Sequence, residues 1–223
     1  MKILNLTKNS KIYTSNVFLV LGSHNAIEDT NTLVDVGRDP AVIDKINNAS
    51  TGVGKKRVGQ VILTHSHYDH STLLPIIREV FNPVVYAFSP FFEGADHILK
   101  NGDHLKLGDS IFEIIYTPGH SNDSICLYSE KKGILFAGDT QLRIRTADVT
   151  YEENYIKAVS EISRRDIRSI YFGHGPDMHS NCNEMIHESL KNIRSPLEKE
   201  QKLIKSLDKL AFGEFGNPAI FAK

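Results

Sequence analysis

The stretch that most constrains the fold is residues 64–70, Thr-His-Ser-His-Tyr-Asp-His, which follows the β-branched and apolar run 58–63. The run predicts a buried strand, so the histidines stand where a strand gives way to a loop. A buried polar group without a partner costs about 1–3 kcal/mol, whereas a metal ion uses the same lone pairs directly. In an extended segment His65 and His67 point to one side, and Asp69 and His70 turn toward a neighbouring position. The stretch therefore predicts a metal site, with a metal-free polar loop as the alternative.

Three further polar residues stand in the same position, at the end of a predicted strand. His120 follows the apolar run 111–116, and Pro118 and Gly119 fix the backbone of the tight loop before it. Asp139 follows the run 133–137, and His174 follows the run 167–172. Together with the first stretch they give a set of N and O ligands without a thiolate. Such a set suits two borderline divalent ions such as zinc, with iron or manganese chemically possible.

The remaining pattern alternates short strands with helices. Strands at 17–21 and 32–37 predict an N-terminal hairpin, and the helical spacing of apolar residues in 71–81 predicts a helix between strands 58–63 and 84–88. Further strands are expected at 111–116, 124–128, 133–137 and 167–172, and helices at 40–48 and 152–164. We expect one domain over residues 1–223, with a helical C-terminal extension from about residue 183.

Charge and composition limit the kinds of partner that we expect this chain to bind. Lys and Arg total 26 against 27 for Asp and Glu, a formal net charge of −1 that lacks the positive surface of a nucleic-acid-binding protein. No apolar run approaches the ~20 residues of a membrane span, and residues 1–8 show no secretory pattern, so we expect a cytoplasmic protein. Cys126 and Cys182 are far apart, which argues against a disulfide framework.

The order of the motifs resembles that of the metallo-β-lactamase superfamily. The shared elements are the His-x-His-x-Asp-His loop, a Pro-Gly-His loop, a Gly-Asp-Thr after a strand and a Gly-His after the last strand, over roughly residues 18–176. The resemblance implies an α+β fold, a four-layer αββα sandwich with two sheets face to face and helices outside. Two successive strand-rich halves are compatible with that fold.

The resemblance also implies a role for each ligand. One ion would bind to three histidines, the other to a second trio, and one aspartate would bridge them: His65, His67 and His120; Asp69, His70 and His174; and Asp139. Asp35 matches the first motif of the family, an acid at a strand end, and we interpret it as a residue that orients a metal-bound His. A solvated strand-end carboxylate is the alternative for Asp35.

The implied activity is hydrolysis of a thioester, lactone or related ester, closest to the glyoxalase II-like group. Two cations ~3.5–4 Å apart lower the pKa of a bridging water to about 7, so hydroxide becomes the nucleophile. Asp69 would orient it or pass a proton. One alternative is a sulfur (persulfide) dioxygenase with a single iron on His65, His120 and Asp139. Another is a metal-binding module without catalysis.

Three residues are candidates for contact with a small-molecule substrate. Arg143 and Arg145 lie just beyond Asp139 and either bind an anionic substrate group or are plain surface arginines. Tyr68 either stabilises an oxyanion through its hydroxyl or packs against the loop. The helical segment 196–210 carries an apolar face, Leu197, Ile204, Leu207 and Leu210, and we expect it to cap the fold or cover the cleft, or to form a homodimer contact.

Overall fold

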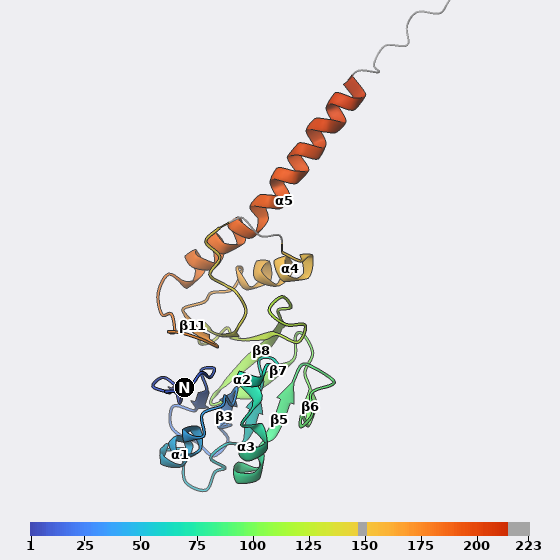
Figure 1. The fold of residues 1–223 in the computed structure, drawn as a ribbon. Coiled ribbons are helices and arrows are strands. Elements are labelled where there is room, and N and C mark those ends of the chain that lie inside the picture. The colour runs from blue at the N-terminus through green and yellow to red at the C-terminus, as the bar shows by residue number, and fades with distance from the viewer. Residues whose placement is uncertain (147–150, 214–223) are drawn as a thin grey trace, which may run out of the picture.

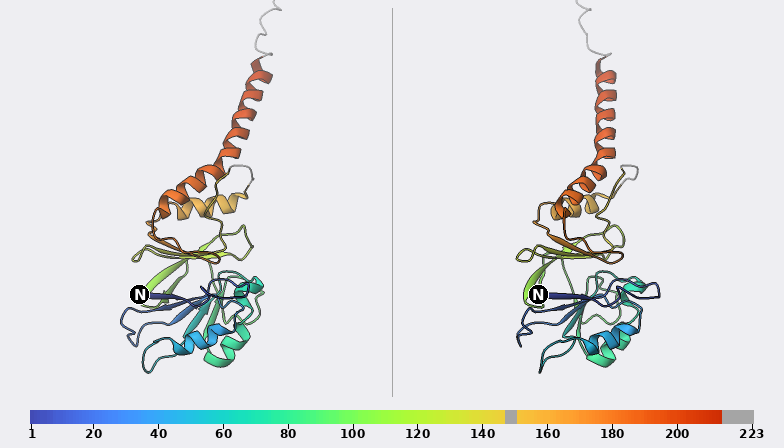
Figure 2. Two further views of the ribbon diagram at one scale, coloured as in Figure 1. Left: turned by 60° about the vertical axis from the view of Figure 1, so that its left-hand side comes forward. Right: turned by 90° about the vertical axis from the view of Figure 1, so that its left-hand side faces the viewer.

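Two β-sheets lie face to face, with helices on the outer surface of each (Figure 1). This computed structural model describes residues 1–146 and 151–213 of the chain. The layers run from α1 and α3 through the first and second sheets to α4 and α5 (Figure 2). The predicted four-layer αββα sandwich is confirmed.

The first sheet has the order β1-β2-β3-β4-β5-β6. Its strands are β1 Lys2–Asn5, β2 Phe18–Leu21, β3 Thr32–Val34, β4 Gln60–Ile62, β5 Val84–Ala87 and β6 His97–Ile98. The predicted hairpin is β2 and β3, which pair antiparallel. Strands β3, β4 and β5 pair in parallel, because α1 (Ala41–Asn48) and α3 (Leu74–Phe81) carry the chain back between them. Sequence patterns did not predict the edge strands β1 and β6, which lack a clear alternation.

The second sheet has the order β11-β10-β9-β8-β7. Its strands are β7 His104–Leu107, β8 Ser110–Tyr116, β9 Ile125–Ser129, β10 Ile134–Gly138 and β11 Ser169–Phe172. Strands β7 to β10 form an antiparallel meander, and β11 pairs in parallel with β10 after a crossover that contains α4 (Glu153–Ile162). All of these strands except β7, placed only within a turn-rich ribbon, were predicted to within a few residues.

Three hydrophobic clusters separate the four layers, because strands buried on both faces send alternate side chains to opposite sides. On β2, Leu19 and Leu21 pack toward α1 and α3, while Phe18 and Val20 pack between the sheets. On β10, Phe136 joins the cluster between the sheets and Leu135 packs toward α4 and α5. Each sheet is thereby covered on both faces by apolar contacts.

Helix α5 (Cys182–Gly213) covers the second sheet with its first turns only. Its buried side chains recur at helical spacing and belong to the cluster under α4: Cys182, Ile186, Leu190 and Ile193. Beyond them the helix runs away from the body of the molecule (Figure 1). None of the described helices is both long and apolar enough to cross a bilayer.

The expectation that segment 196–210 caps the fold or covers the cleft is therefore wrong for the far part of α5. That part extends past α4 instead of folding over the sheet (Figure 2). Ile204, one member of the predicted apolar face, is 51% exposed. The side chains of Leu197, Leu207 and Leu210 lie outside the described part of the structure.

We predict that Phe136→Ala lowers the free energy of unfolding by about 3–5 kcal/mol, the cost of an aromatic side chain removed from a packed core. Phe136 is 1% exposed and its ring lies 5.1–5.8 Å from the rings of Phe18, Phe112 and Tyr171. Urea unfolding measures the change. Phe91→Ala is the control, because Phe91 is 91% exposed and should change stability by less than about 0.5 kcal/mol. Equal losses in the two variants would contradict the layered core.

Candidate metal centre

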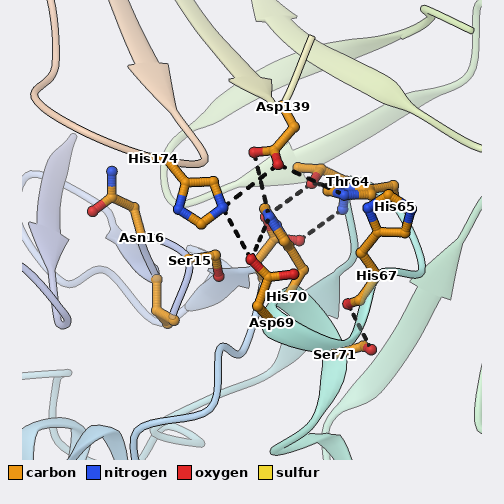
Figure 3. A network of polar contacts seen from close by, with 12 residues as sticks. Ser15, Asn16, Thr64, His65, His67, Asp69, His70, Ser71, Asp139 and His174 are labelled. Atoms are coloured by element: carbon orange, nitrogen blue, oxygen red, sulfur yellow. Dashed lines mark hydrogen bonds and ion pairs between the residues drawn. The ribbon is translucent and has the colours of Figure 1, made fainter. Parts of the chain in front are cut away.

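The seven predicted ligands converge where strands of the two sheets end. Figure 3 shows all of them except His120, which is not labelled there. The loop after β4 carries His65 and His67, and the single turn α2 (Tyr68–Ser71) that follows carries Asp69 and His70. The second sheet supplies the rest from the ends of β8, β10 and β11, namely His120, Asp139 and His174. Each ligand is thus placed by the end of a rigid strand or by the first turn of a helix.

Three groups of these side chains bring one ligand atom each to within 4.8 Å of one another. They are His65, His67 and His120; His65, His70 and Asp139; and Asp69, His70 and His174. The first and third groups are the two trios that the resemblance assigns to separate ions, and Asp139 lies beside both. The structure brings the predicted residues together, and their role as ligands stays a prediction.

Several of the converging atoms have no hydrogen-bond partner although they are buried. They are the Nε2 atoms of His65, His70 and His174, Oδ2 of Asp69 and Oδ1 of Asp139. Leaving such groups unpaired costs about 1–3 kcal/mol each, and more for a charged group. Divalent ions would satisfy them all, since imidazole nitrogens and carboxylate oxygens are the donors that zinc, iron and manganese accept. The donor set therefore fits a metal centre.

The carboxylate of Asp139 lies between the two histidine groups. Its Oδ2 is 3.4 Å from Nε2 of His120 and 3.5 Å from Nε2 of His174, and its Oδ1 is 3.3 Å from Nε2 of His70. Nδ1 of His67 lies 2.9 Å from Nε2 of His120. Ring nitrogens this close share one position for a proton or a cation. The position of the Asp139 carboxylate between the two histidine groups is what a bridging ligand requires.

Asp35 lies directly behind the centre and contacts one of its histidines. Its Oδ2 accepts a hydrogen bond from Nδ1 of His70 at 2.8 Å, and its two oxygens also accept from the amide and the hydroxyl of Thr64 at 2.8 and 2.9 Å. A carboxylate only accepts, so Nδ1 of His70 carries the proton and Nε2 points into the site. Asp35 is buried and holds a left-handed backbone, φ +58°, for which an acidic residue is one of the few tolerated. The contact between Asp35 and His70 is therefore present, and the role of Asp35 in orienting a metal ligand stays a prediction.

The electrostatic environment shifts the pKa values of two neighbouring histidines, His65 and His70, in opposite directions. Burial lowers the pKa of His65 to about 4, so its ring is neutral and has a free lone pair at pH 7. Burial also opposes charge on His70, but Asp35 and Asp139 outweigh it and raise its pKa to about 10. Asp139 has its pKa lowered to about 2, because the contacts with His70 and the other histidines outweigh burial. In the metal-free protein a proton on His70 balances the surrounding carboxylates, and metal binding would displace it.

Two glycines allow the loops to approach. An added Cβ at Gly173 would collide with the carboxylate of Asp139 and lie 2.8 Å from the ring of His70. Gly138 holds φ +50°, and a Cβ there would lie 2.7 Å from the hydroxyl of Thr64. Only glycine leaves room for both strand ends at this distance.

The N-terminal segment 13–16 forms a wall of the site that local sequence patterns did not reveal. The ring of Tyr13 stacks on the ring of His174, with centroids 5.5 Å apart and planes at 14°. The amide of Ser15 donates to the carbonyl of Asp69, and the side-chain amide of Asn16 donates to the carbonyls of Phe172 and Gly175. Figure 3 shows Ser15 and Asn16 beside Asp69 and His174. The segment therefore joins the loop that carries Asp69 to the loop that carries His174. No periodicity or motif in the sequence signals these contacts.

The predicted substrate residues lie at the rim. Tyr68 is 59% exposed and faces the guanidinium of Arg38, 5.0 Å from its ring centre. Arg143 and Arg145 are exposed on the segment after β10, and the guanidinium of Arg143 stacks over the ring of Phe172 at 4.4 Å. All three stay candidates for substrate contact.

Comparison with protein families gives a match to the metallo-beta-lactamase superfamily over residues 12–174. The match begins before β2 and ends on His174, so it includes every strand except β1 and every predicted ligand. ETHE1 from Myxococcus xanthus has a similar solved structure, with a TM-score of 0.65 at 19% identity, covering 89% of this chain and 90% of that one. At this identity the likeness shows the fold.

Two curated relatives are similar in sequence. Atrochrysone carboxyl ACP thioesterase of Aspergillus fumigatus is 27% identical over 148 residues, which is 64% of this chain and 46% of that protein. Hydroxyacylglutathione hydrolase of Hydrogenovibrio crunogenus is 32% identical over 143 residues, 63% of this chain and 49% of that protein. The chain spans about half the length of these relatives.

We predict that Asp35→Asn weakens metal binding about 10- to 100-fold, the usual effect of losing the partner of a metal-bound histidine. An amide offers one acceptor oxygen where three donors now meet a carboxylate. Competition with a chromophoric chelator measures the affinity. Asp166→Asn, at an exposed site outside the centre, should leave it unchanged. Unaltered affinity in Asp35→Asn would contradict the orienting role.

Proposed function

This chain belongs to the metallo-β-lactamase superfamily, and from that premise we propose that it is a metal-dependent hydrolase of a thioester, lactone or related ester. The observation that carries the proposal is the convergence of histidines and aspartates from four strand ends, with buried nitrogen and oxygen atoms that lack a partner on three of them. Such an arrangement is costly unless cations complete it.

In this proposal the ligands divide into two sets that share one residue. His65, His67 and His120 hold the first ion, Asp69, His70 and His174 hold the second, and Asp139 contacts both. The imidazole-rich set of nitrogen and oxygen ligands suits zinc, with iron or manganese as chemical alternatives. When bound, the ions supply a polarising charge for the substrate oxygen and a water that ionises near neutral pH.

The chain's own residues then hold the reacting groups in place. Asp139 fixes the distance between the two ligand sets through its two oxygens. Asp69 is buried, and its Oδ2 lies 3.0 Å from Nε2 of His174 with no hydrogen-bond partner, so it is placed to orient a water or accept its proton. Asp35 fixes the orientation of His70 from behind.

The relatives support the thioester class. The two similar proteins are named as a thioesterase and as a hydroxyacylglutathione hydrolase, and both names describe cleavage of an acyl–sulfur bond. The chain covers only about half of each, so the substrate belongs to the proposal. The match to the family, over residues 12–174, includes every proposed metal ligand.

We predict that His67→Ala and Asp139→Ala each lower the rate of thioester hydrolysis at least 100-fold and reduce the metal bound per chain, because each removes a ligand of the centre. The measurements are hydrolysis of a thioester and lactone panel, elemental analysis and thermal unfolding of the same samples. His104→Ala is the matched control, since His104 is exposed on β7. Full activity in either ligand variant would show the two-ion assignment to be wrong.

Metal content separates the proposal from its alternatives. Two ions per chain with ester or thioester hydrolysis that is lost on chelation and restored by zinc would support the hydrolase. One iron per chain with oxygen uptake on a persulfide would assign a dioxygenase instead. Bound metal without turnover of either class would indicate a binding module.

A further inference from the structure

Three cavities adjoin along segment 140–146, the stretch that follows β10. The first, of about 180 Å³, lies beside His120. The second, of about 450 Å³, runs from His174 past Arg143 and Arg145, and it shares Gln141 and Tyr151 with the first. The third, of about 480 Å³, shares the two arginines with the second. Together they form one trough that passes the metal centre.

The trough is unequal on the two sides of the centre. His120 and His174 both lie within 3.5 Å of Asp139, so a bond cleaved at the centre has one part of the substrate beyond each histidine. The space beyond His120 is small and bordered by Tyr151 and Tyr155, which suits a compact acyl group. Each of the two cavities beyond His174 is more than twice as large. The larger, thiol-bearing part of a thioester fits there.

The arginines face this larger space because buried and exposed side chains alternate along segment 140–146. Leu142 and Ile144 are buried under α5, so Arg143 and Arg145 point to the opposite, open side. Two residues of α5 hold the backbone in this form. Ser189 accepts from the amide of Ile144 and donates to the carbonyl of Leu142, and Asn192 donates to the carbonyl of Ile144.

Neither guanidinium forms an ion pair with a carboxylate of the described residues, and the acidic residues Asp177 and Glu188 line the third cavity but not the second. The arginines that pair with described carboxylates are Arg78, Arg165 and Arg168. Arg143 is held instead by its stack on Phe172, two residues before His174. A guanidinium that is oriented by an aromatic ring and free of a carboxylate offers its donors to an anion.

We propose that Arg143 and Arg145 bind an anionic group, a phosphate or a carboxylate, on the thiol part of the thioester. The inference rests on the proposed function, and it specifies that the substrate's thiol is a charged carrier. Planar guanidinium groups match both anions through paired N–H donors. The compact acyl group then occupies the cavity beside His120.

The test measures binding, so it does not depend on turnover. The probes are S-methylpantetheine 4′-phosphate and S-methylpantetheine, which differ by one phosphate and carry a thioether that cannot coordinate as a thiolate. S-Methylglutathione supplies carboxylates in place of phosphate. Calorimetry with the metal-loaded protein compares the wild type, the double variant Arg143→Gln/Arg145→Gln and the control Arg164→Gln, an exposed arginine beyond the end of α4.

We expect the wild type and Arg164→Gln to bind a charged probe about tenfold more tightly than S-methylpantetheine, the effect of one charge-assisted contact. The double variant should lose that preference and still bind the neutral probe equally well, with unchanged metal content. Preference for the phosphate identifies a phosphopantetheine-type carrier, and preference for S-methylglutathione identifies a carboxylate-bearing thiol. The difference should shrink as salt is raised.

Equal affinity of the wild type for all three probes, or a preference that survives in the double variant, would overturn the anion site. The outcome is separable from that of the proposed function. A protein that shows the arginine-dependent preference but hydrolyses no thioester would keep the anion site and lose the hydrolase proposal. One that hydrolyses neutral and charged thioesters equally well would do the reverse.

Discussion

The cost of burying unpaired polar atoms is the constraint on which the rest of the structure depends. Four strand ends from two sheets deliver histidines and aspartates to one place, and five of their atoms are buried without a partner. Hydrophobic packing between the sheets supplies the free energy that holds these side chains together, because Phe136 and its neighbours fix how closely the sheets approach. Divalent cations would satisfy the atoms that the packing alone leaves unpaired.

The need to pair buried polar atoms also affects the backbone, as Asp35 shows. It ends the strand region of β3 in a left-handed conformation and turns its carboxylate toward Thr64 at the end of β4. The same carboxylate fixes His70. One residue thus ties two parallel strands to a ligand, and the strand register and the orientation of His70 depend on each other. A solvated carboxylate, the alternative for Asp35, does not describe a side chain this buried.

Sequence predicted the ligands because each stands in a local pattern, a strand followed by His or Asp beside Gly or Pro. It did not predict Tyr13 or Asn16, whose contacts with His174 and Phe172 span more than 150 positions and leave no local trace. The edge strands β1 and β6 and the course of α5 were missed for a related reason. Short edges and a projecting helix are decided by what packs beside them, and apolar spacing alone is equally compatible with packing or exposure.

Buried apolar residues alternate with exposed arginines in segment 140–146, and this segment shows what the sequence can predict and what it cannot. Period-two spacing shows that Leu142 and Ile144 share a face opposite Arg143 and Arg145, but it does not show which space each face meets. Helix α5 decides this, since Ser189 and Asn192 hold the segment with its apolar face inward. The arginines are thereby turned toward the trough that begins at His174. In the proposed function the chemistry depends on the candidate metal ligands, whereas in the proposed anion site the choice of substrate depends on this segment, so a change in one need not alter the other.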